Sequence, residues 1–82
     1  MRVELEHRRR LYDVPDAKVV CLAANAYEVT LPRDADAVQR ARRPWTLEGW
    51  DDAVLVLDGV DGESAVASRI DARQVTLTVL LP

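Results

Sequence analysis

Short segments in which apolar and polar residues alternate are the feature that most limits how this chain of 82 residues can fold. In the last such segment, QVTLTVLL, Val75, Leu77 and Val79 fall on one side, while Thr76 and Thr78 fall on the other. Successive side chains of a β-strand point to opposite faces, so this alternation predicts a strand with one buried face. Pro, Gly, Asn and Asp residues separate the segments, as is typical of turns between strands. The pattern therefore predicts a mainly β fold.

Six segments are predicted to be strands. They comprise residues 2–12, 18–23, 26–31, 53–59, 63–70 and 73–81. The second of them, KVVCLA, is apolar on both faces, which indicates a strand that is covered on both sides. We expect a tight turn at Ala24–Asn25 and a closing hairpin across Asp71 and Ala72.

The first predicted strand contains the only histidine of the chain, His7, followed directly by three arginines. When residues 2–12 are read as one strand, Arg8 and Arg10 share the solvent face with two glutamates, and Arg9 lies on the other face with His7. The sequence therefore predicts a solvated strand face on which Arg8 and Arg10 are available to the carboxylates of a partner.

Residues 32–44, with the sequence PRDADAVQRARRP, form the one helical candidate. Asp34 or Asp36 can cap its start, small apolar residues recur at three-residue spacing, and Pro44 ends it. Arginines gather in its last turn, where cations suit the helix dipole. Together with the six strands, this helix predicts a single domain over residues 1–82. The expected architecture is a small β-barrel or β-sandwich of five or six short strands with one short inserted helix.

Composition excludes several classes of protein. With 49% hydrophobic and 30% charged residues, the chain is globular rather than disordered. No apolar run approaches the roughly 20 residues that a membrane-spanning helix needs, and the opening MRVELEHRRR lacks the apolar segment of a secretory signal. Cys21 stands alone and has no partner for an intramolecular disulfide. We therefore expect an intracellular, reducing location and no membrane partner.

The sequence contains no GxSxG, P-loop, HExxH or dinucleotide-binding motif. His7 is expected to be a partly buried structural histidine, and Cys21 is expected to pack in the core as a small hydrophobe. The Asp-Gly pairs near Asp58 and Asp61 are ordinary turn chemistry and lack the length of a calcium-binding loop. These observations predict a protein that is not an enzyme and needs no cofactor, metal or small-molecule substrate.

Charge is distributed unevenly along the chain, whose net charge is −3. Residues 1–45 have nine basic and seven acidic side chains (+2), whereas residues 46–82 have two basic and seven acidic side chains (−5). Regions of opposite sign attract head to tail, so we predict association with other copies of the chain or with a larger structural protein. The expected interface comprises Arg8, Arg10, Arg40, Arg42, Arg43, Trp45, Trp50, Asp51, Asp52, Asp58 and Asp61.

Three features of the sequence leave alternatives open. The arginines of the predicted helix and Trp45 combine cations with an aromatic ring, and small β-barrels bind nucleic acid. A nucleic-acid-binding or regulatory module is therefore the alternative function, although the chain as a whole is acidic. Trp45 and Trp50 can serve either the core or a partner surface, since the chain has no Phe. If the last strand lies at a sheet edge, it offers an unpaired ladder to another chain.

A short chain that is rich in Arg, Ala, Val and Asp, opens with RVELEHRRR and closes with ASRIDARQVTLTVLLP resembles the small β-rich accessory proteins of tailed-phage virions. The resemblance implies a protein that decorates a capsid or lies at the head–tail junction, and that acts by binding rather than by catalysis. We therefore predict a non-catalytic structural or interaction subunit of a larger protein assembly.

Overall fold

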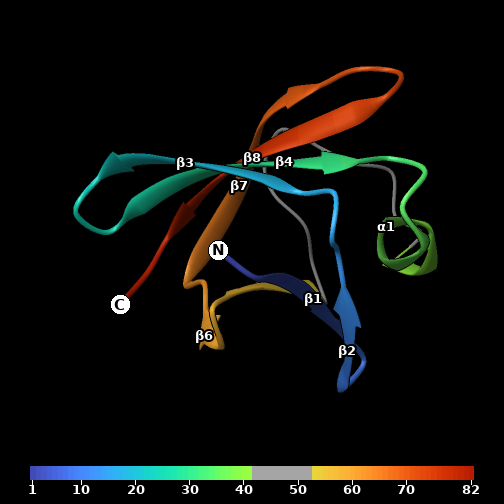
Figure 1. Cartoon of the computed structure of the whole chain (residues 1–82), viewed down its shortest axis with the longest axis horizontal. Helices are drawn as coiled ribbons and strands as arrows, with labels where there is room; N and C mark the ends of the chain where they lie inside the picture. Colours follow the sequence, from blue (N-terminus) through green and yellow to red (C-terminus); the bar gives the residue numbers. More distant parts are fainter. Residues whose placement is uncertain (42–52) are drawn as a thin grey trace.

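Two antiparallel sheets, each of four strands, dominate the computed structural model, which describes residues 1–41 and 53–82. Sheet A has the strand order β2-β1-β5-β6, and sheet B has the order β3-β4-β8-β7. The elements are β1 (Val3–His7), β2 (Arg10–Asp13), β3 (Lys18–Ala23), β4 (Ala26–Pro32), α1 (Asp36–Ala41), β5 (Ala53–Leu57), β6 (Val60–Asp61), β7 (Ser64–Ile70) and β8 (Gln74–Leu80). The sheets face each other as an open sandwich and form no closed barrel (Figure 1).

The mainly β prediction is confirmed, but the expected number of five or six strands is wrong. The predicted first strand divides into β1 and β2, which form a hairpin around Arg8 and Arg9. A two-residue strand, β6, also follows β5 across the turn at Asp58 and Gly59. The first difference comes from a tight turn inside a segment that the alternating pattern treats as continuous. The second is a short strand within a segment that was expected to be only a turn.

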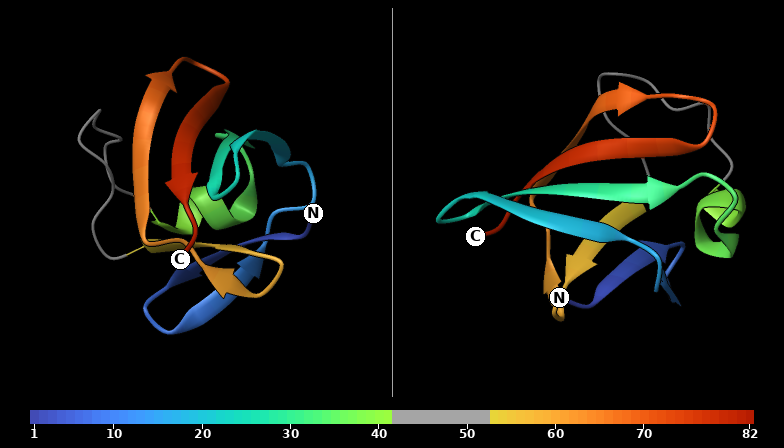
Figure 2. Two further views of the ribbon diagram at one scale, coloured as in Figure 1. Left: turned by 90° about the vertical axis from the view of Figure 1, so that its left-hand side faces the viewer. Right: turned by 45° about the horizontal axis from the view of Figure 1, so that its top comes forward.

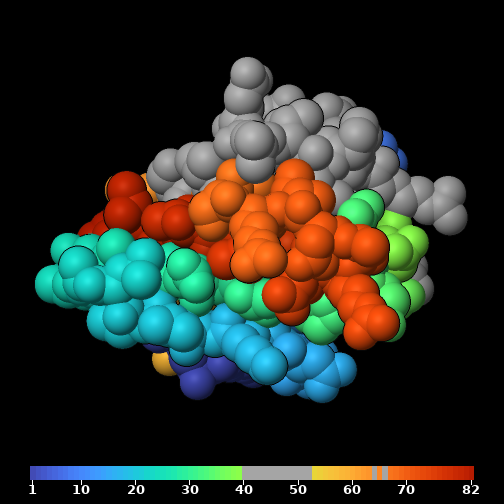
Figure 3. Space-filling model, turned by 90° about the horizontal axis from the view of Figure 1, so that it is seen from above, coloured from blue at the N-terminus to red at the C-terminus, as the bar shows by residue number. Residues whose placement is uncertain are grey.

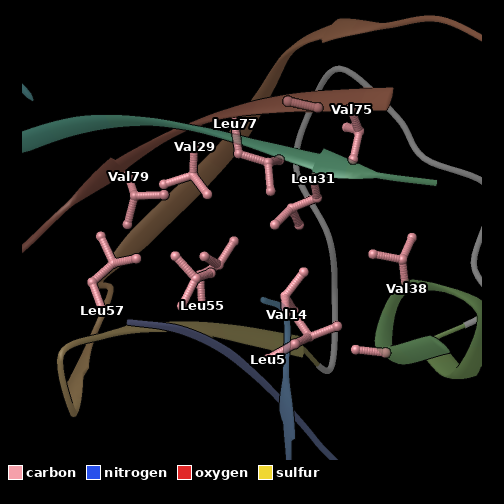
Figure 4. Packing of buried hydrophobic residues seen from close by; sticks show 13 residues of the cluster. Leu5, Val14, Val29, Leu31, Val38, Leu55, Leu57, Val75, Leu77 and Val79 are labelled. Carbon is pink, nitrogen blue, oxygen red and sulfur yellow. The ribbon is translucent and has the colours of Figure 1, made fainter. Parts of the chain in front are cut away.

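Apolar side chains from the two sheets meet in one core (Figure 4). Sheet A contributes Leu5, Leu55 and Leu57, and sheet B contributes Val29, Leu31, Val75, Leu77 and Val79, all almost completely buried. Alternate residues of β4 and β8 point into this core, so the alternation predicted for their apolar residues is confirmed. Thr76, which was expected on the open face of β8, is also buried, and its hydroxyl forms a hydrogen bond with that of Thr30 at 3.2 Å. The hydrophobic effect of burying these rows is what holds the sheets together.

The chain passes from sheet A to sheet B at two crossovers, β2 to β3 and β6 to β7, both within the described residues. At the first, the N–H of Val14 donates to the carbonyl of Val3 at 3.0 Å, and Val14 itself is buried. At the second, the N–H of Gly62 donates to the carbonyl of Leu55 in sheet A, at 2.8 Å. The next residue, Glu63, donates to Leu80 in sheet B, at 2.9 Å. The consecutive N–H groups of Gly62 and Glu63 thus bond to different sheets, and neither is left without a hydrogen bond at the bend.

The predicted helix is present as α1, whose buried residues Ala37 and Val38 face the core. The helix lies at one end of the sandwich, beside the space between the sheets (Figure 1). Residues 32–35 of the predicted helical segment are not helical, since they form the end of β4 and a turn, and residues 42–44 lie outside the described residues. Within the part of the chain that the structure describes, no helix has the length and apolar character needed to cross a membrane.

Strand β3 differs most from its prediction. It was expected to be covered on both faces, but it lies at the edge of sheet B. The side chains of Val20 and Leu22 are 54% and 53% exposed, and Cys21 is exposed rather than buried in the core. The reason is geometric, because the β3–β4 hairpin extends past the end of the sandwich (Figure 2). The last strand, β8, is paired on both sides by β4 and β7 and is therefore not an edge strand.

The loop between β7 and β8, where a closing hairpin was predicted, is stabilised by the carboxylate of Asp71. Oδ1 of Asp71 accepts the N–H groups of Arg73 and Gln74, both at 2.8 Å. These two bonds favour the ionised carboxylate and hold the pKa of Asp71 below its ordinary value of 3.8. A further bond comes from outside the loop, because the guanidinium of Arg33 donates to the backbone carbonyl of Asp71 at 2.6 Å.

Substitution of Gly62 by alanine is expected to destabilise the protein by about 1–3 kcal/mol, as overpacking of a core typically does. A Cβ atom at this position would lie 2.5 Å from Cγ1 of Val79, a buried core side chain, and 3.1 Å from the carbonyl oxygen of Leu55. Urea denaturation gives the free energy of unfolding. A matched control is Gly59→Asn, because Gly59 has open space around it and its positive φ is one that Asn tolerates. Equal stability of Gly62→Ala and the wild type would contradict the tight crossover.

The lowered pKa of Asp71 predicts a pH-dependent effect of the substitution Asp71→Asn. The ionised carboxylate contributes stability that is present above the unfolded pKa and is lost as pH falls through the lower folded pKa. The variant should therefore be less stable than the wild type at neutral pH, and the difference should shrink as pH falls through that value. Denaturation at a series of pH values measures this, and a difference that does not change with pH would contradict it.

Candidate functional site

Three consecutive arginines lie at the tip of the β1–β2 hairpin, and we call Arg8, Arg9 and Arg10 the basic corner. All three side chains are exposed. Both ion pairs found among the described residues involve a different arginine, Arg2, which meets Glu4 at 3.5 Å and Asp13 at 4.0 Å. Within the described part of the chain the three guanidinium groups are therefore left to solvent or to a binding partner.

The prediction that Arg8 and Arg10 share one solvated face of a continuous strand, with Arg9 on the other face, is wrong. His7 pairs with Arg10 across the hairpin, so Arg8 and Arg9 are the two turn residues. Their φ angles are 52° and 67°, as the tight two-residue turns of hairpins require. The turn also reverses the expected phase of the strand, because Leu11 is 57% exposed while Tyr12 packs against the core. The result is a cluster of three cations at one tip.

The basic corner is built at a conformational cost. A residue with a Cβ atom loses roughly 1–2 kcal/mol in the left-handed region, which is why Asn and Gly dominate such turns. Arg8 and Arg9 occupy that region in succession. Strain of this kind concentrates where a surface has a function, so the turn singles out the three arginines as candidates for binding.

Three acidic residues lie in β6 or within two residues of it along the chain, at the other edge of the same sheet, and we call Asp58, Asp61 and Glu63 the acidic corner. All three are exposed. Asp58 also has a structural role, since its carboxylate accepts the N–H of Arg2 at 2.7 Å. The exposure expected for Asp58 and Asp61 is thus present, and Glu63 joins them because the crossover at Gly62 keeps it beside β6.

Strand order separates the two corners. β2, which begins with Arg10, and β6, which ends with Asp61, are the two edge strands of sheet A, with β1 and β5 between them. Figure 1 shows them on opposite sides of the lower sheet. Because the corners lie across the sheet from each other, one copy of the chain cannot bring its own basic corner onto its own acidic corner.

The other candidate groups do not converge on a reactive centre within the described residues. His7 is half-buried in β1, whereas Cys21 lies in the opposite sheet and donates its thiol proton to the carbonyl of Ala23 at 3.2 Å. No group of three or more His, Cys, Asp or Glu side chains among the described residues is arranged to hold a metal ion.

An open pocket of about 210 Å³ lies where β3, β4 and β8 begin or end. No motif in the sequence predicts it. Its lining comprises Asp16, Lys18, Thr30, Pro32, Arg73 and Gln74. Lys18, Arg73 and Gln74 are exposed side chains, and Asp16 places a carboxylate among the cations. The pocket is therefore a shallow surface feature of mixed charge.

Several predicted interface residues fall outside the part of the chain that the structure describes. These are Arg42, Arg43, Trp45, Trp50, Asp51 and Asp52. Arg40 lies in α1, but its side chain is not among those described. The structure thus brings together Arg8 and Arg10 at one corner and Asp58 and Asp61 at the other.

Comparison with known proteins gives no family to which these features can be referred. No protein-family model, no curated protein and no solved structure matches the chain. A fold alone does not identify a function, so the function is argued from the surfaces themselves.

The strained turn predicts that the double substitution Arg8→Asn with Arg9→Gly stabilises the protein by about 1–2 kcal/mol, because these residues prefer a positive φ. Chemical denaturation measures the change as a higher midpoint with an unchanged slope. The matched control, Arg8→Gln with Arg9→Gln, removes the same two charges but keeps the unfavourable backbone. An equal gain in both variants would assign the effect to relief of charge repulsion and contradict backbone strain.

Proposed function

We propose that this protein is a non-catalytic assembly subunit whose copies join head to tail, the basic corner of one copy against the acidic corner of the next. The observation that carries the proposal is the position of the two corners on the opposite edge strands of sheet A. A contact between two different patches leaves one patch of each kind free at the ends, so it can continue into a ring or a filament.

The chemistry of the two corners supports this pairing. Arginine presents a planar fork of donors that matches the two oxygens of a carboxylate, and such charge-assisted hydrogen bonds are stronger than neutral ones. The side chains of Asp61 and Glu63 are exposed, as are those of the three arginines. Exposed ion pairs contribute only about 0.2–1 kcal/mol each, so the contact should be weak, rapid and sensitive to salt.

The proposed setting is a larger assembly, in line with the resemblance to small accessory proteins of tailed-phage virions. A lattice of copies or a larger structural protein with an acidic surface would offer many equivalent sites to the basic corner. Repetition of a weak contact gives high overall affinity, because each further contact forms within an already joined assembly. A weak single contact is therefore compatible with a stable particle.

One observation favours a second candidate function, nucleic-acid binding. The major groove of DNA admits a two-stranded β-ribbon, and the basic corner presents three arginines at the tip of such a ribbon. Against it stand the net charge of −3 and the glutamates and aspartate, Glu4, Glu6 and Asp13, on the same hairpin. Fluorescence anisotropy with a labelled duplex tests this candidate, and binding that weakens steeply with salt would support it.

Charge reversal of each corner should abolish head-to-tail association, and mixing the two reversed proteins should restore it. The first variant is Arg8→Glu with Arg10→Glu, and the second is Asp61→Lys with Glu63→Lys. Asp58 is left unchanged because its carboxylate binds the backbone of Arg2. Each variant alone has two corners of like sign, whereas in the mixture every corner finds its opposite. Sedimentation velocity at low salt and at about 1 M salt, where screening reduces the Debye length to about 3 Å, measures the mass.

A control separates a specific contact from general repulsion. Arg69→Glu with Arg73→Glu also changes the net charge from −3 to −7, two reversals of −2 each, at exposed positions in sheet B and its loop. This control should associate more strongly than the variant of the basic corner. The proposal is wrong if the wild type stays monomeric at low salt, or if the mixture of reversed proteins associates no more than either one alone.

A further inference from the structure

The edge strand β3 and its hairpin carry an uncharged surface that the single chain leaves uncovered. Residues 19–27 contain no charged side chain, in a chain with 11 basic and 14 acidic residues, and the half-buried Glu28 lies opposite Val20 in β4. Val20, Leu22 and Leu80 are large apolar side chains that are 54%, 53% and 46% exposed. Figure 3 shows the hairpin as one end of the face seen from above, projecting past the strands beside it.

The backbone of β3 is also available. Among the described residues it has β4 on one side and no strand on the other. Its N–H and C=O groups along the outer edge therefore have no ladder partner from those residues, and an edge of this kind is a template for pairing with another strand. Natural edges are usually guarded by charges, but here the one charged residue, Lys18, stands at the very start of the strand.

The other three edge strands are better protected. β2 carries Arg10 and Asp13 at its two ends, β6 is only two residues long, and β7 carries Arg69 beside a register shift. Short strands, charges and irregularities are the devices that prevent edge-to-edge association. β3 has a register shift as well, but it lies between Cys21 and Ala23 and leaves the first four residues regular.

We propose that β3 pairs antiparallel with β3 of a second copy of this chain, forming a two-fold dimer in which two copies of sheet B become one continuous sheet. Self-pairing is consistent with the absence of charge, because an isologous contact sets a patch against itself and a patch of one sign would repel its copy. The sequence of β3, apolar on both faces, is that of a strand in the interior of a sheet. In the dimer, β3 occupies such an interior position.

The regular part of the strand defines the register. In antiparallel pairing, opposed residues lie on the same face of the sheet, so the two-fold axis must pass through a residue pair rather than between two neighbouring pairs. An axis at Val20 opposes Val20 to its own copy and opposes Val19 to Cys21 of the second copy. Lys18 then faces Leu22 of the second copy, and its methylene stem can cover that side chain while its ammonium group reaches water.

This interface lies at a different edge from the proposed head-to-tail contact, which involves the two edges of sheet A and Glu63 at the crossover, and salt separates the two. At about 1 M salt the charged contact is screened, whereas strand pairing with apolar burial persists. Sedimentation equilibrium at high salt should therefore give a mass of twice 9.2 kDa at high protein concentration. A protein that stays monomeric at every concentration at high salt overturns the dimer, whatever the result at low salt.

Two variants test the location of the contact. Val20→Lys and Leu22→Lys each place an ammonium group on the edge at a side chain that is already half-exposed, so the fold should tolerate them. Each should shift the protein to monomer, while circular dichroism verifies that the strands remain. Leu11→Lys, at a side chain with 57% exposure in β2, is the matched control and should leave the dimer intact. A dimer that survives both edge variants overturns the proposal.

Cross-linking tests the register. In a Cys21→Ala background, Val20→Cys should give a disulfide-linked dimer with diamide, which takes up the two electrons and two protons that the thiol pair loses. Opposed residues lie about 4.5–5.5 Å apart between Cα atoms, within the range that a disulfide spans. Leu11→Cys in the same background has a similarly exposed position and should remain monomeric. Equal cross-linking of the two variants would show random collision and overturn the register.

Discussion

The facing rows of apolar side chains between the two sheets are the interaction on which the rest of the structure depends. Each sheet has one apolar face, and among the residues that the structure describes this face is covered mainly by the apolar face of the other sheet. Leu5 and Leu57 from sheet A meet Val29 and Val79 from sheet B in this layer (Figure 4). A chain of this length buries only about 60–65% of its unfolded surface, so it has little stability to spare.

Packing of these rows requires the chain to change sheets without leaving backbone groups unpaired. Gly62 meets that requirement, because its amide bonds to sheet A, the next amide bonds to sheet B, and the missing side chain leaves room for Val79. The same crossover makes β6 short and sets Glu63 beside it. The packing at the Gly62 crossover thus determines the position of the acidic corner.

The sequence predicts the strands best where one face is buried and the other is not. In β4 and β8 the burial of Val29 and Leu77 follows the alternation, since only one register places every apolar residue in the core. It also predicts turns made by Asp and Gly, such as Asp58–Gly59. It fails at Arg8–Arg9, because two arginines with positive φ carry no turn signal, and the cross-strand pairing of β1 and β2 overrides the local preference.

The prediction that β3 is covered on both faces fails for a different physical reason. The pattern of apolar residues along a strand indicates which of its faces are buried, but it does not indicate which molecule buries them. Within one chain, Val20 and Leu22 remain half-exposed and Cys21 is exposed. From the sequence, these side chains were expected to be buried by the rest of the same chain. Of the predicted interface, exposure of Arg8, Arg10, Asp58 and Asp61 could be derived from charge, whereas their grouping into two corners depends on strand order, which local patterns do not encode.

The two proposed contacts differ in symmetry, and the difference determines what they can build together. Head-to-tail pairing of charged corners propagates in one direction, while strand pairing at β3 is two-fold and closes on itself. A protein with both kinds of contact connects filaments or rings in pairs and can cover an extended surface. Salt would act mainly on the first contact, whereas the second depends mainly on the apolar edge, so a small sandwich of this kind can assemble in two separately controlled steps.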